Sequence, residues 1–290
     1  MSAIAIHRPT SLEEAVGLLD EMGEEAMVVA GSTAVAIMVT QGLIAPTALI
    51  GIDRLPGLSE IRHLDGAIEI GALVTHRAVE RSPILRERIP VLAETFARVA
   101  NARVRNAATV GGVLAEADYA SDPPAVLLAL DASLVATGPE GARTIPLTRF
   151  FKGFYETDLA PNEILTAVRI PVPPAGTGAV YEKYVTRSSE DRPCVGAIAM
   201  VRFSDDGATV AELRAAVAAA AETPQRFAEV ESAAIGRDLT DALAREVADA
   251  YADRIDTLDD LRGSAAYRTK MIRVWVRRAI EGAADRARSR

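Results

Sequence analysis

Two short stretches of the sequence combine small residues with hydroxyl groups in a way that can bind an anion. The first, "AGSTA" at residues 30–34, follows an apolar run predicted to be a strand and precedes a predicted helix. The second, "TVGGV" at residues 109–113, places two glycines after a threonine. Small residues let backbone N–H groups face outward, and a helix N-terminus adds partial positive charge. Each loop can therefore hold a phosphate group.

Each loop also has a simpler interpretation. Ser32 or Thr33 can merely cap the following helix, and Gly111-Gly112 can be a plain turn. The first loop has one glycine and no lysine, so it is neither the G-x-G-x-x-G fingerprint nor a P-loop. Two such loops, both beside apolar strands, are more informative than either alone, because they could grip the two phosphates of a dinucleotide from two sides.

Two further side chains could do chemistry. "SDPP" at residues 121–124 predicts a helix start, with Ser121 or Asp122 as the cap and proline in the first turn. Asp122 could instead accept hydrogen bonds from a ribose or an adenine. His76, in "GALVTHRAVERSP", could be a base or an attachment point for a flavin, but a structural, hydrogen-bonded histidine is the favoured interpretation.

The cysteine and histidine counts limit redox and metal chemistry. The chain has one cysteine, Cys194, and three histidines. It therefore cannot form an internal disulfide or hold an iron–sulfur cluster on four of its own thiolates. A zinc site would need nearly all of these scattered residues, so we expect no metal site. Electrons, if the protein transfers them, must reside in an organic cofactor or on another chain.

Composition and charge exclude several other classes of protein. Hydrophobic residues make up 49% and charged residues 25% of the chain, as in an ordinary globular protein. The formal net charge of -8 argues against a nucleic-acid surface, which needs clustered Lys and Arg. No apolar run reaches the length of about 18 residues that a membrane-spanning helix needs. No signal peptide is apparent, so we expect a cytoplasmic protein.

The pattern of apolar residues predicts the elements that position these loops. "AIAIHRP" alternates like a strand, and Ser11 to Glu14 form a capping box that opens a helix through about Met22. "IPVLAETFARVA" predicts a helix, and "AVLLALDASLVAT" predicts a helix passing into a strand. The alanine-rich "AELRAAVAAAAE" favours a helix by propensity, with an alternating strand left open.

The C-terminal third begins with a predicted linker and ends with a predicted long helix. The Pro- and Gly-rich "PVPPAGTGA" at residues 171–179 is typical of a linker. A long helix is predicted from about Ala265 to Arg288. It carries an amphipathic face that we expect to pack or to contact another subunit, formed by Ile272, Trp275, Ala279 and Ala283.

Taken in order, these motifs resemble one family, the FAD-binding medium subunit of molybdenum hydroxylases, as in carbon monoxide dehydrogenase and the flavin portion of xanthine dehydrogenase. The likeness begins at "AGSTA", continues through "VRNAATVGGVL", "ADYASDPP", "NEILTAVRIPVP" and "YEKY", and ends at "YRTKMIRVWVRRAI". It covers nearly the whole chain. Each motif is modest alone, but the ordered set is specific.

The resemblance implies an α+β fold in two domains. Residues 1–177 would form a PCMH-type FAD-binding domain of two α/β subdomains. Residues 178–290 would form a C-terminal domain like that of the carbon monoxide dehydrogenase flavoprotein, with a short antiparallel sheet plus helices. In that domain the alanine-rich segment would be partly strand, against its propensity.

The resemblance also implies noncovalent FAD and names its binding residues. No catalytic residue and no metal ligand are implied. Asp122 would lie toward the adenosine half, Leu165 would pack nearby, and Lys183 would approach the isoalloxazine, although a solvated strand lysine is an equal alternative. The residues that would wrap the pyrophosphate, mostly through backbone N–H groups, are Ala30, Gly31, Ser32, Thr33, Ala34, Thr109, Val110, Gly111, Gly112 and Val113.

Two positions depart from the family pattern. Ser32 stands where a second glycine is usual, and Val113 stands where Asn or Asp is common. Either change can alter flavin affinity. Gly111→Val is expected to expel the flavin while leaving the fold largely intact.

The function implied is electron transfer within a larger enzyme. An iron–sulfur small subunit with [2Fe-2S] clusters would supply electrons taken from a large subunit that holds the molybdenum cofactor, and FAD would pass them to an external acceptor. A dimer of heterotrimers is the expected assembly. Two alternatives are a stand-alone FAD-dependent reductase and a non-catalytic nucleotide-binding or assembly module. The sequence indicates neither the substrate nor the acceptor.

Overall fold

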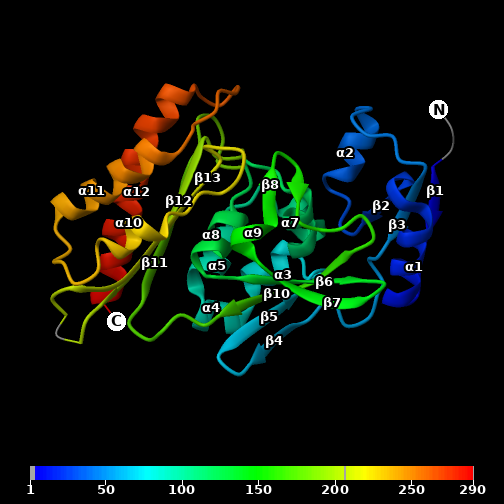
Figure 1. Cartoon of the computed structure of the whole chain (residues 1–290), viewed down its shortest axis with the longest axis horizontal. Coiled ribbons are helices and arrows are strands. Elements are labelled where there is room, and N and C mark those ends of the chain that lie inside the picture. The colour runs from blue at the N-terminus through cyan, green and yellow to red at the C-terminus, as the bar shows by residue number, and fades with distance from the viewer. Residues whose placement is uncertain (1–3, 206, 290) are drawn as a thin grey trace. The chain divides into compact units, whose positions relative to one another are not determined.

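The chain folds into two compact units that interleave along the sequence (Figure 1), in a computed structural model that describes residues 4–205 and 207–289. The first unit comprises the chain up to Val79, Asn101–Ala117 and Ala132–Pro171. The second comprises Glu80–Ala100, Asp118–Asp131 and the chain from Val172 onward. The second unit thus includes three stretches that precede the domain boundary predicted at residues 177–178, and that boundary stays a prediction. The α+β class is confirmed.

A small parallel sheet begins the first unit. Its strands lie in the order β1-β3-β2, with bounds Ala5–His7, Ala48–Gly51 and Ala26–Val29. Helix α1 (Leu12–Met22) and the short 3-10 turn η1 (Gly23–Glu25) connect β1 to β2. The Ser11 hydroxyl accepts a hydrogen bond from the Glu14 amide at 3.1 Å, so the predicted cap is confirmed. The apolar face of α1 then packs against this sheet through Ala15, Val16 and Leu19.

A larger antiparallel sheet forms the rest of the first unit. The strand order is β4-β5-β10-β6-β7, with bounds Ile61–Leu64, Ala67–Gly71, Ile164–Pro171, Ser133–Gly138 and Gly141–Pro146. Helix α6 (Ala102–Ala107) leads into α7 (Val110–Glu116), and α7 packs on β5 and β10. After β7 the chain continues into α9 (Leu147–Phe150). It then forms a hairpin of β8 (Phe151–Gly153) and β9 (Glu156–Thr157). The end of β5 and the start of α7 are thereby brought together.

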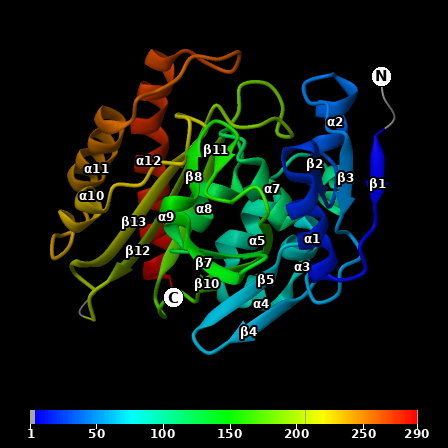
Figure 2. The same cartoon turned by 45° about the vertical axis from the view of Figure 1, so that its right-hand side comes forward.

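The second unit is built on the antiparallel sheet β11-β12-β13, with bounds Gly178–Tyr184, Val195–Phe203 and Val210–Ala218. Figures 1 and 2 show α11 (Asp241–Arg254) and α12 (Ala265–Arg288) lying along this sheet. The sheet also packs against α5 (Pro90–Ala97) and α8 (Pro123–Ala129). Shorter helices complete the unit: α4 (Pro83–Arg88) precedes α5, and α10 (Ala228–Ser232) precedes α11. Helix α3 (His76–Arg81) lies where the chain passes from the first unit to the second.

One propensity-based prediction is wrong. The alanine-rich segment forms strand β13, not a helix, and its residues from Ala215 to Ala218 are buried. Helices α8 and α10 both pack against β13, and small side chains allow that close approach. Tertiary packing therefore overrides the helix propensity of alanine.

Most other predicted elements are confirmed. The helix-to-strand passage appears as α8 followed by β6, and the linker joins β10 to β11. On α12, Ile272, Ala279 and Ala283 are fully buried, and Trp275 packs against the same core. The amphipathic face of that helix is therefore used inside the unit.

A pair of glycine substitutions tests this packing. Gly17 lies inside α1 with open space around it, so Gly17→Ala should stabilise the protein by about 1 kcal/mol through helix propensity. A Cβ on Gly178 would lie 2.0 Å from the Ala283 carbonyl oxygen of α12. Gly178→Ala should therefore destabilise by about 1–3 kcal/mol. Urea unfolding measures both, and changes of the same sign would contradict this account of β11 against α12.

Candidate functional site

The first predicted loop lies between β2 and α2 (Val35–Thr40) in the first unit. Ser32 adopts a left-handed backbone with φ 57°, and its carbonyl accepts a hydrogen bond from the Ala36 amide at 3.0 Å. Left-handed φ is costly for a residue with a Cβ, which explains why the resembled family usually has glycine there. Ser32 itself is exposed.

The amides of this loop are available to a ligand. Within residues 4–205 and 207–289, no hydrogen-bond acceptor lies at the backbone N–H of Gly31, Ser32, Thr33 or Ala34. Successive backbone N–H groups around a left-handed residue form a concave anion-binding surface. The start of α2 adds partial positive charge to it. This loop is therefore the better of the two candidates for holding a phosphate.

The second loop lies directly beside the first. A Cβ on Gly31 would lie 1.9 Å from the Ala107 carbonyl oxygen and 3.1 Å from the Ala108 Cα. Gly31 is therefore required by the close approach of another backbone segment. That segment ends α6 and leads straight into Thr109.

Four of the five amides of the second loop, those of residues 110–113, already have acceptors within the chain. Val110 donates to the Val74 carbonyl at 2.9 Å, and Gly111 donates to the Ala72 carbonyl at 2.8 Å. Gly112 donates to the Thr109 hydroxyl at 3.1 Å, and Val113 donates to the Thr109 carbonyl. The sequence predicted that this loop binds pyrophosphate mostly through backbone N–H groups. In this structure the amides of residues 110–113 have acceptors within the chain, and the contacts of this loop with the pyrophosphate stay a prediction.

The structure also gives another reason for Gly111. A Cβ there would lie 2.6 Å from the Ala72 Cβ and 2.9 Å from the Ala72 carbonyl oxygen. Gly111→Val would therefore disturb the contact between α7 and the end of β5. This close approach argues against the expectation that the variant leaves the fold largely intact, and the loss of flavin stays a prediction.

His76 lies under the second loop. Its backbone amide donates to the Ala108 carbonyl at 2.9 Å, and its ring is buried. Burial lowers the pKa of His76 to about 4, with the Arg105 charge adding to the effect and a hydrogen bond from the ring to the Thr109 backbone opposing it. The imidazole is therefore neutral at pH 7, as expected for a structural histidine.

Asp122 and Lys183 form a buried ion pair in the second unit. The Lys183 ammonium donates to the Asp122 carboxylate at 2.9 Å and to the Arg98 carbonyl at 2.9 Å. The Tyr181 hydroxyl donates to the other Asp122 oxygen at 2.6 Å. The two charged side chains are 4% and 3% exposed, so the alternative of a solvated lysine is wrong. Asp122 lies at the start of α8, but its side chain does not cap that helix.

The environment fixes the protonation of this cluster. Burial raises the pKa of Asp122, while the Lys183 charge and the two hydrogen bonds oppose the rise. Burial and the Asp122 charge both raise the pKa of Tyr181, so its hydroxyl stays protonated as a donor. The sequence analysis missed Tyr181. The available signal was its position two residues before Lys183, which puts both side chains on one face of a strand.

Leu165 lies in β10, opposite Ala136 of β6, and is buried in the larger sheet of the first unit. A register shift between Leu165 and Ala167 interrupts the ladder at this point. Its predicted position beside the adenosine stays a prediction, as do the ligand contacts of Asp122 and Lys183.

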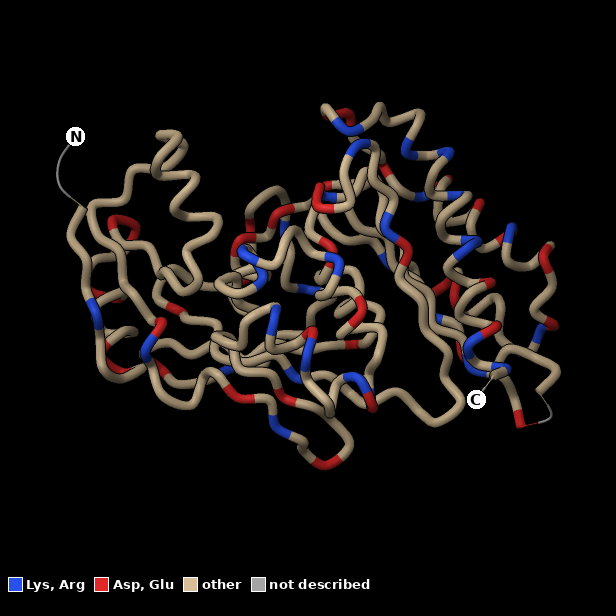
Figure 3. The backbone as a smooth tube through the Cα atoms, turned by 180° about the vertical axis from the view of Figure 1, so that it is seen from behind, with Lys and Arg blue, Asp and Glu red and all other residues tan. Residues whose placement is uncertain are grey.

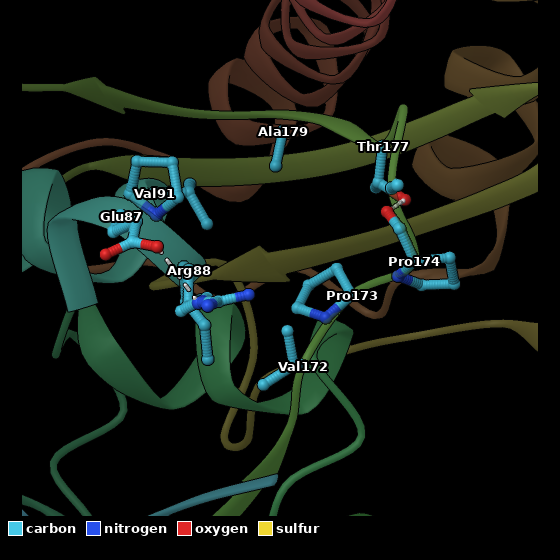
Figure 4. Close-up of a pocket in the computed structure, with 11 residues that line it drawn as sticks. Glu87, Arg88, Val91, Val172, Pro173, Pro174, Thr177 and Ala179 are labelled. Carbon is cyan, nitrogen blue, oxygen red and sulfur yellow. Dashed lines mark hydrogen bonds and ion pairs between the residues drawn. The ribbon is translucent and has the colours of Figure 1, made fainter. Parts of the chain in front are cut away.

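A separate pocket of about 200 Å³ lies in the second unit (Figure 4). It is lined by the end of α4, the start of α5 and the linker segment from Val172 to Thr177. Its charged side chains, Glu87 and Arg88, pair with each other at 3.3 Å. None of the predicted site residues lines it, so it is not the candidate site.

The described ranges also bear on metals and membranes. In them, no group of three or more His, Cys, Asp and Glu side chains is placed to hold a metal ion. None of the helices described is both long enough and apolar enough to cross a membrane.

Comparison with known proteins places these observations in a family. Residues 2–173 match the family described as "FAD binding domain in molybdopterin dehydrogenase", and residues 180–283 match "CO dehydrogenase flavoprotein C-terminal domain". The chain is 36% identical over 277 residues to the carbon monoxide dehydrogenase medium chain of Hydrogenophaga pseudoflava, covering 96% of each. It is 34% identical over 278 residues to the 6-hydroxypseudooxynicotine dehydrogenase complex subunit alpha of Paenarthrobacter nicotinovorans, covering 96% of this chain and 93% of that one.

Solved structures agree with the sequence matches. A carbon monoxide dehydrogenase from Hydrogenophaga pseudoflava that lacks the Mo-pyranopterin moiety of the molybdenum cofactor superposes with a TM-score of 0.95, at 37% identity over 98% of both chains. Quinoline 2-oxidoreductase from Pseudomonas putida 86 gives a TM-score of 0.92 at 28% identity, again over 98% of both chains.

The buried ion pair generates a stability prediction. Asp122→Asn or Lys183→Met alone leaves an unpaired buried charge and should cost about 3–5 kcal/mol. The double variant has no charge to bury, and the amide introduced at position 122 can still accept from the Tyr181 hydroxyl, so it should cost less than either single variant. Urea unfolding of the four proteins measures this coupling. As the matched control, Arg237→Met breaks the exposed pair with Glu246 and should cost about 1 kcal/mol or less. Additive costs at Asp122 and Lys183 would refute the pairing.

His76 generates a prediction of pH dependence. Its pKa in the folded protein, about 4, lies below the ordinary value of 6.5, so the folded state favours the neutral ring. This contribution is complete above pH 6.5 and is lost as the pH falls toward 4, a difference of about 3 kcal/mol. Gln cannot titrate, so the free energy of unfolding of wild type minus that of His76→Gln should fall by this amount between pH 7 and pH 4. A difference that does not change with pH would show that His76 is not buried as a neutral ring.

Proposed function

We propose, because the chain belongs to the family of FAD-binding medium subunits of molybdenum hydroxylases, that it carries electrons from a partner iron–sulfur subunit through FAD to an external acceptor. Family membership makes it an oxidoreductase subunit with an FAD-binding domain. The route of the electrons and the acceptor are the parts that we propose.

The first loop is the observation that supports this function most directly. The pyrophosphate of FAD is an anion, and the loop offers it the four backbone N–H groups of residues 31–34, none of which has an acceptor in the described chain. Amides fixed by the backbone need no rearrangement to donate to phosphate oxygens. The loop therefore fits a dinucleotide phosphate without any positively charged side chain.

The chain's own residues bind and position the cofactor. Gly31 lets the first loop lie directly against the Ala107 carbonyl. This close packing fixes the direction in which the amides of the loop point. FAD, when bound, supplies the ability to accept and release electrons singly or in pairs. The protein's contribution is binding and orientation, and no general base is required of it.

The buried cluster in the second unit gives Lys183 a fixed position. We propose that the Lys183 ammonium, held by Asp122, stabilises negative charge on reduced flavin, and that Leu165 packs beside the adenosine. A charge held in a buried site acts more strongly on its neighbours than one in water. Tyr181 supports this role because it occupies the second Asp122 oxygen.

The single cysteine requires that iron–sulfur chemistry take place on other chains. One thiolate cannot hold a cluster that needs four. We propose an iron–sulfur small subunit and a molybdopterin large subunit as partners, in a dimer of heterotrimers. The relatives support a multi-subunit enzyme, since one is named a medium chain and another a complex subunit. The cytoplasmic location stays a prediction from the sequence.

Ser32 provides the test of the first loop. Ser32→Gly keeps the amide and removes the cost of the left-handed backbone, so it should bind FAD at least as tightly as wild type. Ser32→Val places a β-branched residue at φ 57° and should weaken FAD binding about fivefold or more. Flavin fluorescence titration of the apoprotein gives both affinities, and circular dichroism checks that the variants fold.

The outcomes separate this function from its alternatives. Equal affinities for both variants would show that the loop does not contact the pyrophosphate. A purified wild-type chain that is colourless and stays so with saturating FAD would refute the proposed function and favour a nucleotide-binding or assembly module.

A further inference from the structure

Helix α2 is apolar and yet buries none of its side chains. Its sequence is "VAIMVT", and every one of its residues is half-buried or exposed. Ile37 is 56% exposed, and Leu43, in the turn that follows, is 68% exposed. We define the α2 surface as α2 together with the turn through Leu43. Large apolar side chains gathered on one exposed helix and turn are typical of an interaction site.

The α2 surface also lacks charge. From Ala26 to Ile52 the chain has no Asp, Glu, Lys, Arg or His, although a quarter of all its residues are charged. Figure 3 shows this segment without blue or red, in contrast to the helices of the second unit. Within the α2 surface itself, the exposed polar side chains are the uncharged ones of Thr40 and Gln41. A partner that covers this surface therefore meets no charge that it must pair or desolvate.

The lack of charge indicates which kind of partner fits. Permanent subunit interfaces are more hydrophobic than transient interfaces, because the surfaces of a transient interface are exposed to water whenever the partners are apart. An external electron acceptor must leave after each turnover, whereas a subunit that delivers electrons stays bound. The apolar, uncharged α2 surface is therefore typical of a permanent subunit interface.

The position of α2 in the chain indicates which subunit docks on the α2 surface. α2 starts at Val35, immediately after the loop proposed to hold the FAD pyrophosphate, and its six residues span about 9 Å. The electron-donating subunit has to dock within reach of the bound FAD, and the α2 surface adjoins the loop proposed to hold the pyrophosphate of that cofactor. We propose that the α2 surface is the docking surface for an uncharged, apolar face of the electron-donating iron–sulfur subunit. This inference rests on the proposed function.

The test uses the whole enzyme, isolated through an affinity tag on this chain. Ile37→Glu and Leu43→Glu each place a charge on the α2 surface. Each should lower the iron and molybdenum recovered per mole of this chain at least tenfold, while FAD per chain and the unfolding midpoint stay at wild-type values. Ile235→Glu is the matched control, since Ile235 is 46% exposed in the second unit, and it should lower neither metal.

Salt provides a second measurement on the wild-type enzyme. Because neither face of the proposed interface is charged, iron should stay with this chain in 1 M salt, where charge pairs are screened within about 3 Å. Release of the iron-bearing subunit by salt alone would overturn the proposal of an uncharged partner face.

The remaining outcomes either overturn the inference or assign the α2 surface to a different ligand. Full retention of iron and molybdenum by both α2 variants would overturn the inference and leave the proposed function standing. Loss of FAD from Ile37→Glu would assign the surface to the cofactor. An isolated wild-type chain that dimerises, and whose dimer Ile37→Glu abolishes, would assign it to a second copy. An isolated wild-type chain that never binds FAD would refute the proposed function itself.

Discussion

The candidate site depends on one backbone contact, the position of Gly31 against the Ala107 carbonyl. No residue with a Cβ fits there, since that atom would lie 1.9 Å from the carbonyl oxygen. The contact places the first loop on the end of α6. The carbonyls of Ala72 and Val74 in turn hold the start of α7. The two loops are thus positioned by main-chain atoms from four segments of one unit, and this position varies little with side-chain identity.

The same contact explains why two loops that look alike in sequence differ in structure. Both pair small residues with a hydroxyl, and nothing in the local sequence ranks one above the other. A glycine indicates that something approaches the backbone closely, but it does not say what. At Gly111 the approaching group is Ala72, and the amides there are satisfied; around Ser32 four amides have no acceptor in the described chain. The difference depends on strand ends more than thirty residues away, which local pattern cannot reveal.

Elements whose cause is local could be predicted, and those whose cause is distant could not. The cap at Ser11 and the long helix α12 follow from neighbouring residues. Strand β13 depends on the helices that pack on its alanines, and the motif resemblance, not propensity, pointed to a strand there. The pair of Asp122 and Lys183 joins residues 61 positions apart. Its members were correctly identified as important one by one, but their mutual bond and the third partner, Tyr181, required the fold.

The other exposed helices of this chain show how α2 differs from an ordinary water-facing helix. Helices α11 and α12 meet water with ion pairs, as where Arg273 bonds both Asp249 and Asp253. On α12 the apolar side chains of Ile272, Val276 and Ile280 are buried, and the helix also carries charged side chains that meet water. α2 has the opposite arrangement, with no charge and no buried side chain. The exposed faces of α11 and α12 carry charged side chains, and α2 has none. We infer that another molecule covers the surface of α2. On the two proposals made above, the free amides at the start of α2 would bind an anion and the apolar residues along it would bind a protein, on adjoining parts of one short segment.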